Sequence, residues 1–91
     1  MVTFLSHLVQ HGTDYERFEE IEGQILSIMA EYGGEYLFRL KHHDGSGESH
    51  LVTFPSDADF ERFRADPRRL QLREEMGQHQ TSIKLTRCTV L

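Results

Sequence analysis

The stretch His50-Leu-Val-Thr-Phe-Pro-Ser-Asp-Ala-Asp-Phe-Glu-Arg-Phe-Arg-Ala-Asp-Pro67 is the most informative part of the chain. Its residues Leu51 to Phe54 are β-branched or apolar, which is typical of a strand. Ser56, with an acidic residue three positions later, has the spacing of a helix cap. Phe60 and Phe63 then give a helix its buried stripe. Asp66-Pro67 breaks that helix and restarts it, because proline fits a first helical turn.

The residues before this stretch predict a strand, a long helix and a hairpin. Residues 2 to 10 are typical of a strand. Thr13 stands three residues before Glu16, the spacing of a capping box, so we expect a helix to begin at Asp14. Apolar residues recur along it at three- and four-residue steps, which predicts one buried face. Gly33-Gly34 should end it with a left-handed cap.

Two further strands, at residues 35 to 42 and 48 to 54, flank Asp44-Gly-Ser-Gly47, whose residue types suit a hairpin turn with positive φ angles. Residues 80 to 90 predict a fourth strand. The order strand, helix, strand, strand, helix, strand predicts an α+β, ferredoxin-like fold. We expect a four-stranded antiparallel sheet with its helices on one face, formed by residues 1 to 91 as a single domain.

The predicted strands carry apolar side chains on both faces. In the first strand, Phe4 and Leu8 oppose Leu5 and Val9. An antiparallel sheet with one solvated face should alternate apolar and polar residues, so a second layer should cover the face that lacks helices. We expect that layer to be a second copy of the chain, with the two sheets paired face to face in a homodimer.

The composition argues against several partners. A net charge of -5 is unlike the basic face that nucleic acid requires. No apolar run approaches the length of a membrane span, and the first residues do not resemble a signal peptide. The single Cys88 cannot form an internal disulfide, which fits a reducing compartment. We therefore expect no nucleic acid partner, no membrane partner and a cytoplasmic location.

A resemblance to the dimeric α+β barrel superfamily is carried by three pieces of the chain. These are Gly33-Gly34 leading to Tyr36-Leu-Phe-Arg39, the hairpin, and Leu51-Val-Thr-Phe-Pro-Ser56 ahead of an Asp-Phe-Glu-Arg-Phe helix. Within the superfamily the chain is most similar to the uncharacterised DUF1330 family, and next to the antibiotic-biosynthesis-type monooxygenases. The resemblance implies a homodimer of ferredoxin-like domains.

The chain also departs from both family patterns. Arg39 matches the arginine that ends a strand in DUF1330 proteins, but Thr53 replaces an acidic residue, and Asp66-Pro-Arg-Arg69 lacks the tyrosine expected after the second helix. The monooxygenase pattern expects an acid and a tryptophan where this chain has Thr53 and Phe54. These departures weaken the transfer of either family's chemistry.

Three polar residues are the candidate site, on the strand face expected between the paired sheets. That face should contain Thr3, Leu5, His7, Val9, Leu37, Arg39, Lys41, Leu51 and Thr53. His7 is the candidate catalytic acid or base and a ligand contact, because imidazole titrates near neutrality. Arg39 would bind a carboxylate or enolate with its planar fork, and Thr53 would add a hydroxyl. Each also has a structural interpretation: an interface histidine, a salt bridge and a strand former.

The histidines do not predict a metal site. His42 and His43 are consecutive strand residues and should point to opposite faces, and His50 brings no fixed carboxylate or cysteine with it. Cys88 has no surrounding signature of a nucleophile, so we expect it to serve packing. We predict neither a metal nor a cofactor.

Three functions remain open. The first is a homodimeric domain that binds a small anionic or aromatic organic molecule, between sheet and helices or between the paired sheets. The second is a cofactor-independent monooxygenase or isomerase, in which His7 moves a proton and Arg39 stabilises an oxyanion. The third is a structural oligomer with no ligand site. The missing acid places the binding domain first, and the ligand and pathway stay unspecified.

Overall fold

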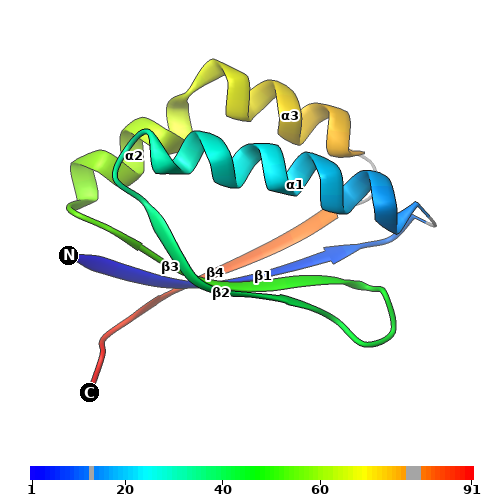
Figure 1. The fold of residues 1–91 in the computed structure, drawn as a ribbon, viewed down its shortest axis with the longest axis horizontal. Coiled ribbons are helices and arrows are strands. Elements are labelled where there is room, and N and C mark those ends of the chain that lie inside the picture. Colours follow the sequence, from blue (N-terminus) through cyan, green and yellow to red (C-terminus); the bar gives the residue numbers. More distant parts are fainter. Residues whose placement is uncertain (13, 78–80) are drawn as a thin grey trace.

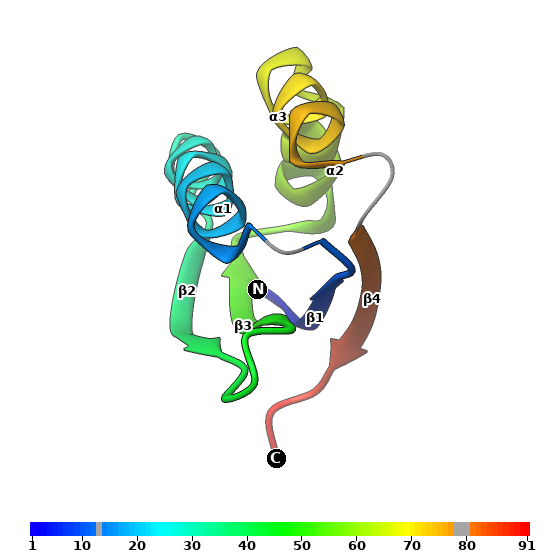
Figure 2. The same cartoon turned by 90° about the vertical axis from the view of Figure 1, so that its right-hand side faces the viewer.

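The computed structural model describes residues 1–12, 14–77 and 81–91. Its elements in chain order are β1 (Val2–Gln10), α1 (Tyr15–Ala30), β2 (Glu35–Lys41), β3 (Gly47–Phe54), α2 (Asp57–Ala65), α3 (Pro67–Gly77) and β4 (Thr81–Cys88). The strands form one antiparallel sheet in the order β2-β3-β1-β4. Figures 1 and 2 show all three helices on one face of this sheet. The predicted α+β, ferredoxin-like fold is confirmed.

The helices begin and end close to the predicted positions. Asp14 caps α1 by accepting a hydrogen bond from the backbone N–H of Arg17 at 3.0 Å. The cap therefore lies one residue beyond the predicted capping position, Thr13, which is outside the described residues. A carboxylate suits this position because the helix N-terminus carries partial positive charge. Gly33 follows α1 with a φ of 75°, as the left-handed cap requires.

The helix pair after β3 also follows its sequence signals. The Ser56 hydroxyl accepts a hydrogen bond from the Asp59 backbone N–H at 3.2 Å, which satisfies the first turn of α2. Asp66 has an extended backbone, and Pro67 begins α3 directly after it. The predicted break and restart of the helix at Asp66-Pro67 is confirmed.

The core lies between the sheet and the helices. The Phe54 ring is 5.2 Å from the Phe60 ring and 5.5 Å from the Phe63 ring, and Phe4 stacks on Phe60 at 4.2 Å. Ile21, Ile25 and Met29 of α1 complete this layer and are almost fully buried. Aromatic rings each bury a large apolar area, which matters in a chain with so small a core.

A register shift in β2 overturns one sequence prediction. Tyr36 pairs with Val52, but Phe38 pairs with Leu51, so Leu37 is an extra residue in the strand. One inserted residue reverses the face of every side chain beyond it.

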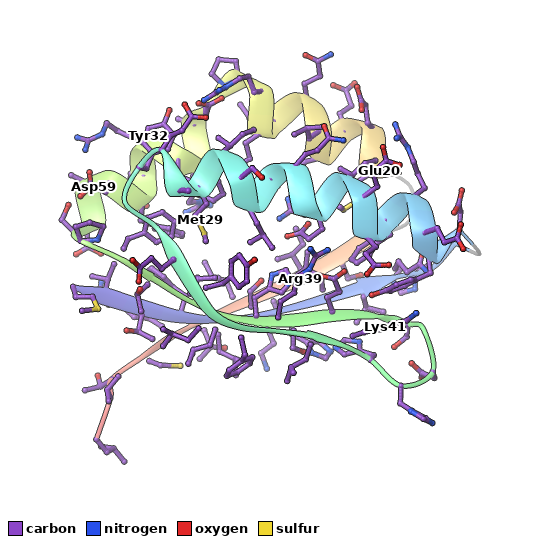
Figure 3. All side chains as sticks on the ribbon, viewed as in Figure 1. Glu20, Met29, Tyr32, Arg39, Lys41 and Asp59 are labelled. Atoms are coloured by element: carbon purple, nitrogen blue, oxygen red, sulfur yellow. The ribbon has the colours of Figure 1, made fainter. Side chains whose placement is uncertain are left out.

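Arg39 and Lys41 consequently face the helices, whereas the alternation of the sequence had placed them with His7 on the opposite face. Arg39 pairs with the buried His50, and the Lys41 ammonium lies 4.0 Å from the centre of the Tyr15 ring of α1. Figure 3 shows the Arg39 side chain between the sheet and α1.

The face of the sheet that lacks helices carries exposed apolar side chains. Leu5 is 39 % exposed, Phe38 37 % and Leu40 53 %.

Among the helices that the structure describes, none has both the length and the apolarity needed to cross a membrane.

Candidate functional site

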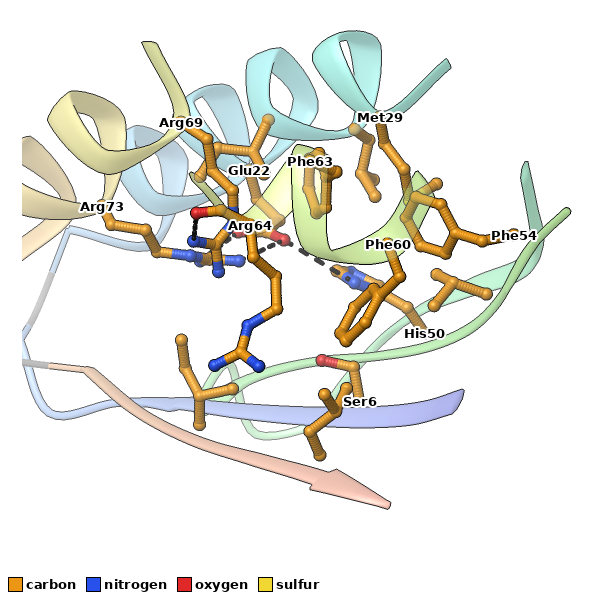
Figure 4. A pocket seen from close by; sticks show the side chains of 15 residues that line it. Ser6, Glu22, Met29, His50, Phe54, Phe60, Phe63, Arg64, Arg69 and Arg73 are labelled. Carbon is orange, nitrogen blue, oxygen red and sulfur yellow. Dashed lines mark hydrogen bonds and ion pairs between the residues drawn. The ribbon is translucent and has the colours of Figure 1, made fainter. Parts of the chain in front are cut away.

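A cavity of about 310 Å³ lies between the sheet and the helices. Its apolar wall comes mainly from α1, α2 and β3, with a rim on β4, and consists of Ile25, Leu26, Met29, Val52, Phe54, Phe60, Phe63, Ile83 and Leu85. Its polar groups are Ser6, Glu22, His50, Arg64, Arg69 and Arg73. Figure 4 shows Arg64 extending from the helix side towards Ser6 on the sheet, with Arg69 and Arg73 beside Glu22. An apolar cavity with a few convergent polar groups is the usual form of a small-molecule site.

Glu48 is the centre of a buried polar network beside this cavity. Its Oε1 accepts hydrogen bonds from Arg39 Nε at 2.6 Å and His50 Nε2 at 2.7 Å. Its Oε2 accepts from Arg39 Nη2 at 2.9 Å and from the Tyr15 hydroxyl at 3.2 Å. The carboxylate is thus fully hydrogen-bonded although Glu48 is only 1 % exposed. A buried charge is tolerated when it is paired in this way.

The network continues from His50 to the helices. His50 Nδ1 lies 3.7 Å from Glu22 Oε1, and the Glu22 carboxylate accepts a hydrogen bond from Arg73 Nη1 at 2.7 Å. Because an ionised carboxylate only accepts hydrogen bonds, the contact with Glu48 places a proton on His50 Nε2. In neutral His50 this leaves the Nδ1 lone pair on the Glu22 side of the ring. His50 is thus held between two carboxylates, with Glu48 at one ring nitrogen and Glu22 beside the other.

Burial and hydrogen bonding together set the ionisation of two groups. Burial raises the pKa of Glu48, but the hydrogen bonds from His50 and Arg39 outweigh it and lower that pKa from 4.5 to about 2. Burial, followed by the charge of Glu48 and its hydrogen bond, raises the pKa of Tyr15 to about 12. At neutral pH Glu48 is therefore ionised and Tyr15 keeps its proton.

The residues predicted from the sequence as a site do not come together. His7 lies on the face without helices, where its Nδ1 is 3.1 Å from the Ser49 hydroxyl and its ring stacks on His42 at 4.6 Å. Thr53 pairs with Thr3 and is buried on that same face. Arg39 lies on the opposite face and is bound to Glu48. None of the three is among the cavity residues.

Sequence reasoning missed Glu22 and Glu48, and considered His50 only as a possible metal ligand. A local signal existed for two of them. Glu22 occupies a helical position one turn from Ile25 and Leu26, within the apolar stripe. His50 precedes Val52 at the two-residue spacing of one strand face, so it had to share the buried side of β3.

No group of three or more histidine, cysteine, aspartate or glutamate side chains in the described ranges is arranged to hold a metal ion. His42 Nε2 is instead 2.9 Å from the Ser49 hydroxyl, and His50 is engaged with Glu48 and Glu22.

The fold is shared with several solved structures. A cofactor-independent oxygenase from Streptomyces nogalater matches with a TM-score of 0.76 and 18% identity, over 99% of this chain and 92% of that one. An antibiotic biosynthesis monooxygenase matches with a TM-score of 0.78 and 9% identity, over 100% and 99% of the two chains. A NIPSNAP domain protein from Burkholderia xenovorans gives 0.74 and 13%, over 100% and 95%. No family model and no curated protein matches the sequence.

At these identities the likeness establishes the architecture. The chain has the ferredoxin-like α+β fold of the antibiotic-biosynthesis monooxygenase type. The fold that the resemblance implied is therefore confirmed.

Proposed function

We propose that this protein binds a small organic molecule in the cavity between the sheet and the helices. The observation that carries the proposal is the cavity itself, whose volume of about 310 Å³ lies within the usual range for small-molecule sites. Its wall offers aromatic rings from Phe54, Phe60 and Phe63, which suit a flat apolar ligand. This site replaces the one built on His7, Arg39 and Thr53.

Blocking the cavity should abolish binding of a neutral aromatic probe such as naphthamide. Ser6 lines the cavity from β1, so the side chain of Ser6→Phe would occupy the space that a ligand needs. We expect the methyl NMR signals of Ile25 and Met29 to shift with naphthamide in the wild type and to stay still in Ser6→Phe. Ala58→Phe places the same side chain on the exposed surface of α2 and should leave the shifts unchanged. A wild type whose signals do not move at millimolar probe contradicts the proposal.

We propose, as a second function, that the cavity catalyses proton transfer as a cofactor-independent oxygenase or isomerase. The specific support is His50, which borders the cavity and is held by Glu48 on one ring nitrogen with Glu22 near the other. Removal of a proton from carbon yields a carbanion, which can be reprotonated elsewhere or can transfer an electron to dioxygen. One structural neighbour is described as a cofactor-independent oxygenase.

His50→Gln should slow the exchange of carbon-bound protons for solvent deuterium in a carbon acid such as β-tetralone. A positioned general base contributes about 10²- to 10⁴-fold, so we expect the exchange measured by NMR to fall by that factor. His43→Gln, at an exposed position beside the hairpin turn, is the matched control and should exchange at the wild-type rate. Equal exchange rates in wild type and His50→Gln would exclude His50 as the base.

We also propose a homodimer that pairs the two helix-free sheet faces. Exposed Leu5, Phe38 and Leu40 support it, because a two-fold axis would bury the same apolar patch of both copies. A cytoplasmic location and the closer likeness to the DUF1330 family remain predictions.

Leu5→Arg should convert this dimer to a monomer, because it places a charge within the apolar patch. Sedimentation equilibrium measures the change. Leu70→Arg is the control, since Leu70 is 52 % exposed on α3, away from the sheet face. A wild type that sediments as a monomer at tens of micromolar would rule out the pairing.

A further inference from the structure

The helix side of the cavity has more positive charge than the protein neutralises. Arg64 of α2 and Arg69 and Arg73 of α3 all line it, whereas Glu22 is the one carboxylate among the described lining residues. Glu22 is already paired with Arg73. Among the described residues, the carboxylate nearest to Arg64 is that of Glu61, an exposed residue whose Oε1 lies 3.6 Å from Arg64 Nη1.

Arg69 is the arginine of this group that has no carboxylate partner among the described residues. In the part of the chain that the structure describes, it forms no ion pair. Its Nη1 donates to the backbone carbonyl of Arg64 at 3.0 Å, and its guanidinium lies 5.2 Å from the centre of the Phe63 ring. Its Nε is buried without a hydrogen-bond partner, as is the Nε of Arg73. Buried donors that lack a partner cost free energy, which a ligand acceptor would recover.

The electrostatics of Arg69 agree with this geometry. Burial, followed by the charges of Arg73 and Arg64, lowers the pKa of Arg69 to about 10. The position of the Arg69 guanidinium therefore costs free energy in two ways, through desolvation and through repulsion by the two neighbouring arginines. A negative charge in the cavity would relieve both costs.

We infer that the ligand of this cavity is an amphipathic organic anion, with an apolar body against the phenylalanines and a carboxylate-like group bound by Arg69 between Arg64 and Arg73. The inference rests on the proposed binding function and names its ligand class. The proposed anion-binding residue is thus Arg69 of α3 and not Arg39, whose guanidinium is paired with Glu48. A planar guanidinium can bind a carboxylate with two parallel hydrogen bonds.

The test compares naphthoate with naphthamide, which share the same ring system and differ in charge. Their dissociation constants are measured by NMR titration of the Ile25 and Met29 methyl groups and the Arg69 Nε–H signal. We expect the wild type to bind naphthoate at least about 10-fold more tightly, the difference expected for one hydrogen-bonded charge pair. Arg69→Gln should abolish that preference and leave the affinity for naphthamide unchanged.

Arg62→Gln is the matched control, because Arg62 is an exposed α2 residue paired with Asp59. It should keep the wild-type preference for naphthoate. Equal affinity of the wild type for the two probes overturns the inference while leaving the binding function intact, and this comparison needs no variant. A preference that survives in Arg69→Gln overturns the assignment to Arg69. Binding of neither probe overturns the proposed function and the inference with it.

Discussion

Glu48→Ala is expected to destabilise the protein by about 3 to 5 kcal/mol, the cost of removing one partner from a buried ion pair. The substitution leaves Arg39 Nε, His50 Nε2 and the Tyr15 hydroxyl without the acceptor they share. Arg39 is partly exposed and can recover some hydration, which places the expected loss towards the lower end of that range. Urea unfolding at neutral pH measures the change.

Glu20→Ala is the control for charge removal without burial. Glu20 forms an exposed pair with Arg17 at 3.6 Å, and such pairs contribute only about 0 to 1 kcal/mol. A Glu48→Ala variant as stable as Glu20→Ala would mean that the network contributes nothing to the fold.

The same network predicts how stability depends on acid. The pKa of Glu48 is lowered in the folded state to about 2, so its contribution is complete above the ordinary value of 4.5 and is lost as the pH falls from there to about 2. A shift of this size corresponds to about 3 kcal/mol. The pKa of Asp66 is also lowered, by hydrogen bonds from Arg68 and Tyr32, but its contribution is common to wild type and Glu48→Ala. The difference between their pH profiles therefore isolates Glu48, and parallel profiles would contradict the assignment.

Gly47→Ala is expected to cost about 3 kcal/mol or more, because it combines backbone strain with a steric overlap. Gly47 has a φ of 155° and opens β3 opposite Val9. A Cβ at this position would overlap the backbone carbonyl oxygen of Leu8. The two central strands would have to separate at that end, next to Glu48. Thermal unfolding of the variant measures the loss.

Gly45→Ala separates the two causes. Gly45 also has a positive φ, of 76°, but a Cβ there would meet nothing within 4 Å. Only the left-handed backbone is then penalised, at about 1 to 2 kcal/mol. If the two alanine variants lost equal stability, the contact between Gly47 and β1 would not limit the strand pairing.

Element boundaries were predictable because their signals are local. The cap at Ser56, the break at Asp66-Pro67 and the positive φ of Gly33 and Gly45 each depend on a few neighbouring residues. The strand ends moved by one or two residues from their predicted positions, and the cap of α1 is at Asp14, one residue beyond the predicted position.

The candidate site could not be predicted in the same way, because its residues come from distant parts of the chain. His50 lies between Glu48 of its own strand and Glu22 of α1, and Arg73 reaches Glu22 from α3. The sequence pattern shows that Glu22 and His50 are on buried faces, but not which groups meet them there.

Local sequence was sufficient for the order of the strands and helices, their caps and the choice of an α+β fold, since caps, turns and periodicity act over one or two turns of backbone. The face of Arg39 depended on the extra residue in β2, and that bulge exists only where β2 pairs with β3. The cavity and its arginines likewise depend on how α2 and α3 pack over the sheet. Side-chain partners across a sheet or between layers are set by register and packing, which adjacent residues do not specify.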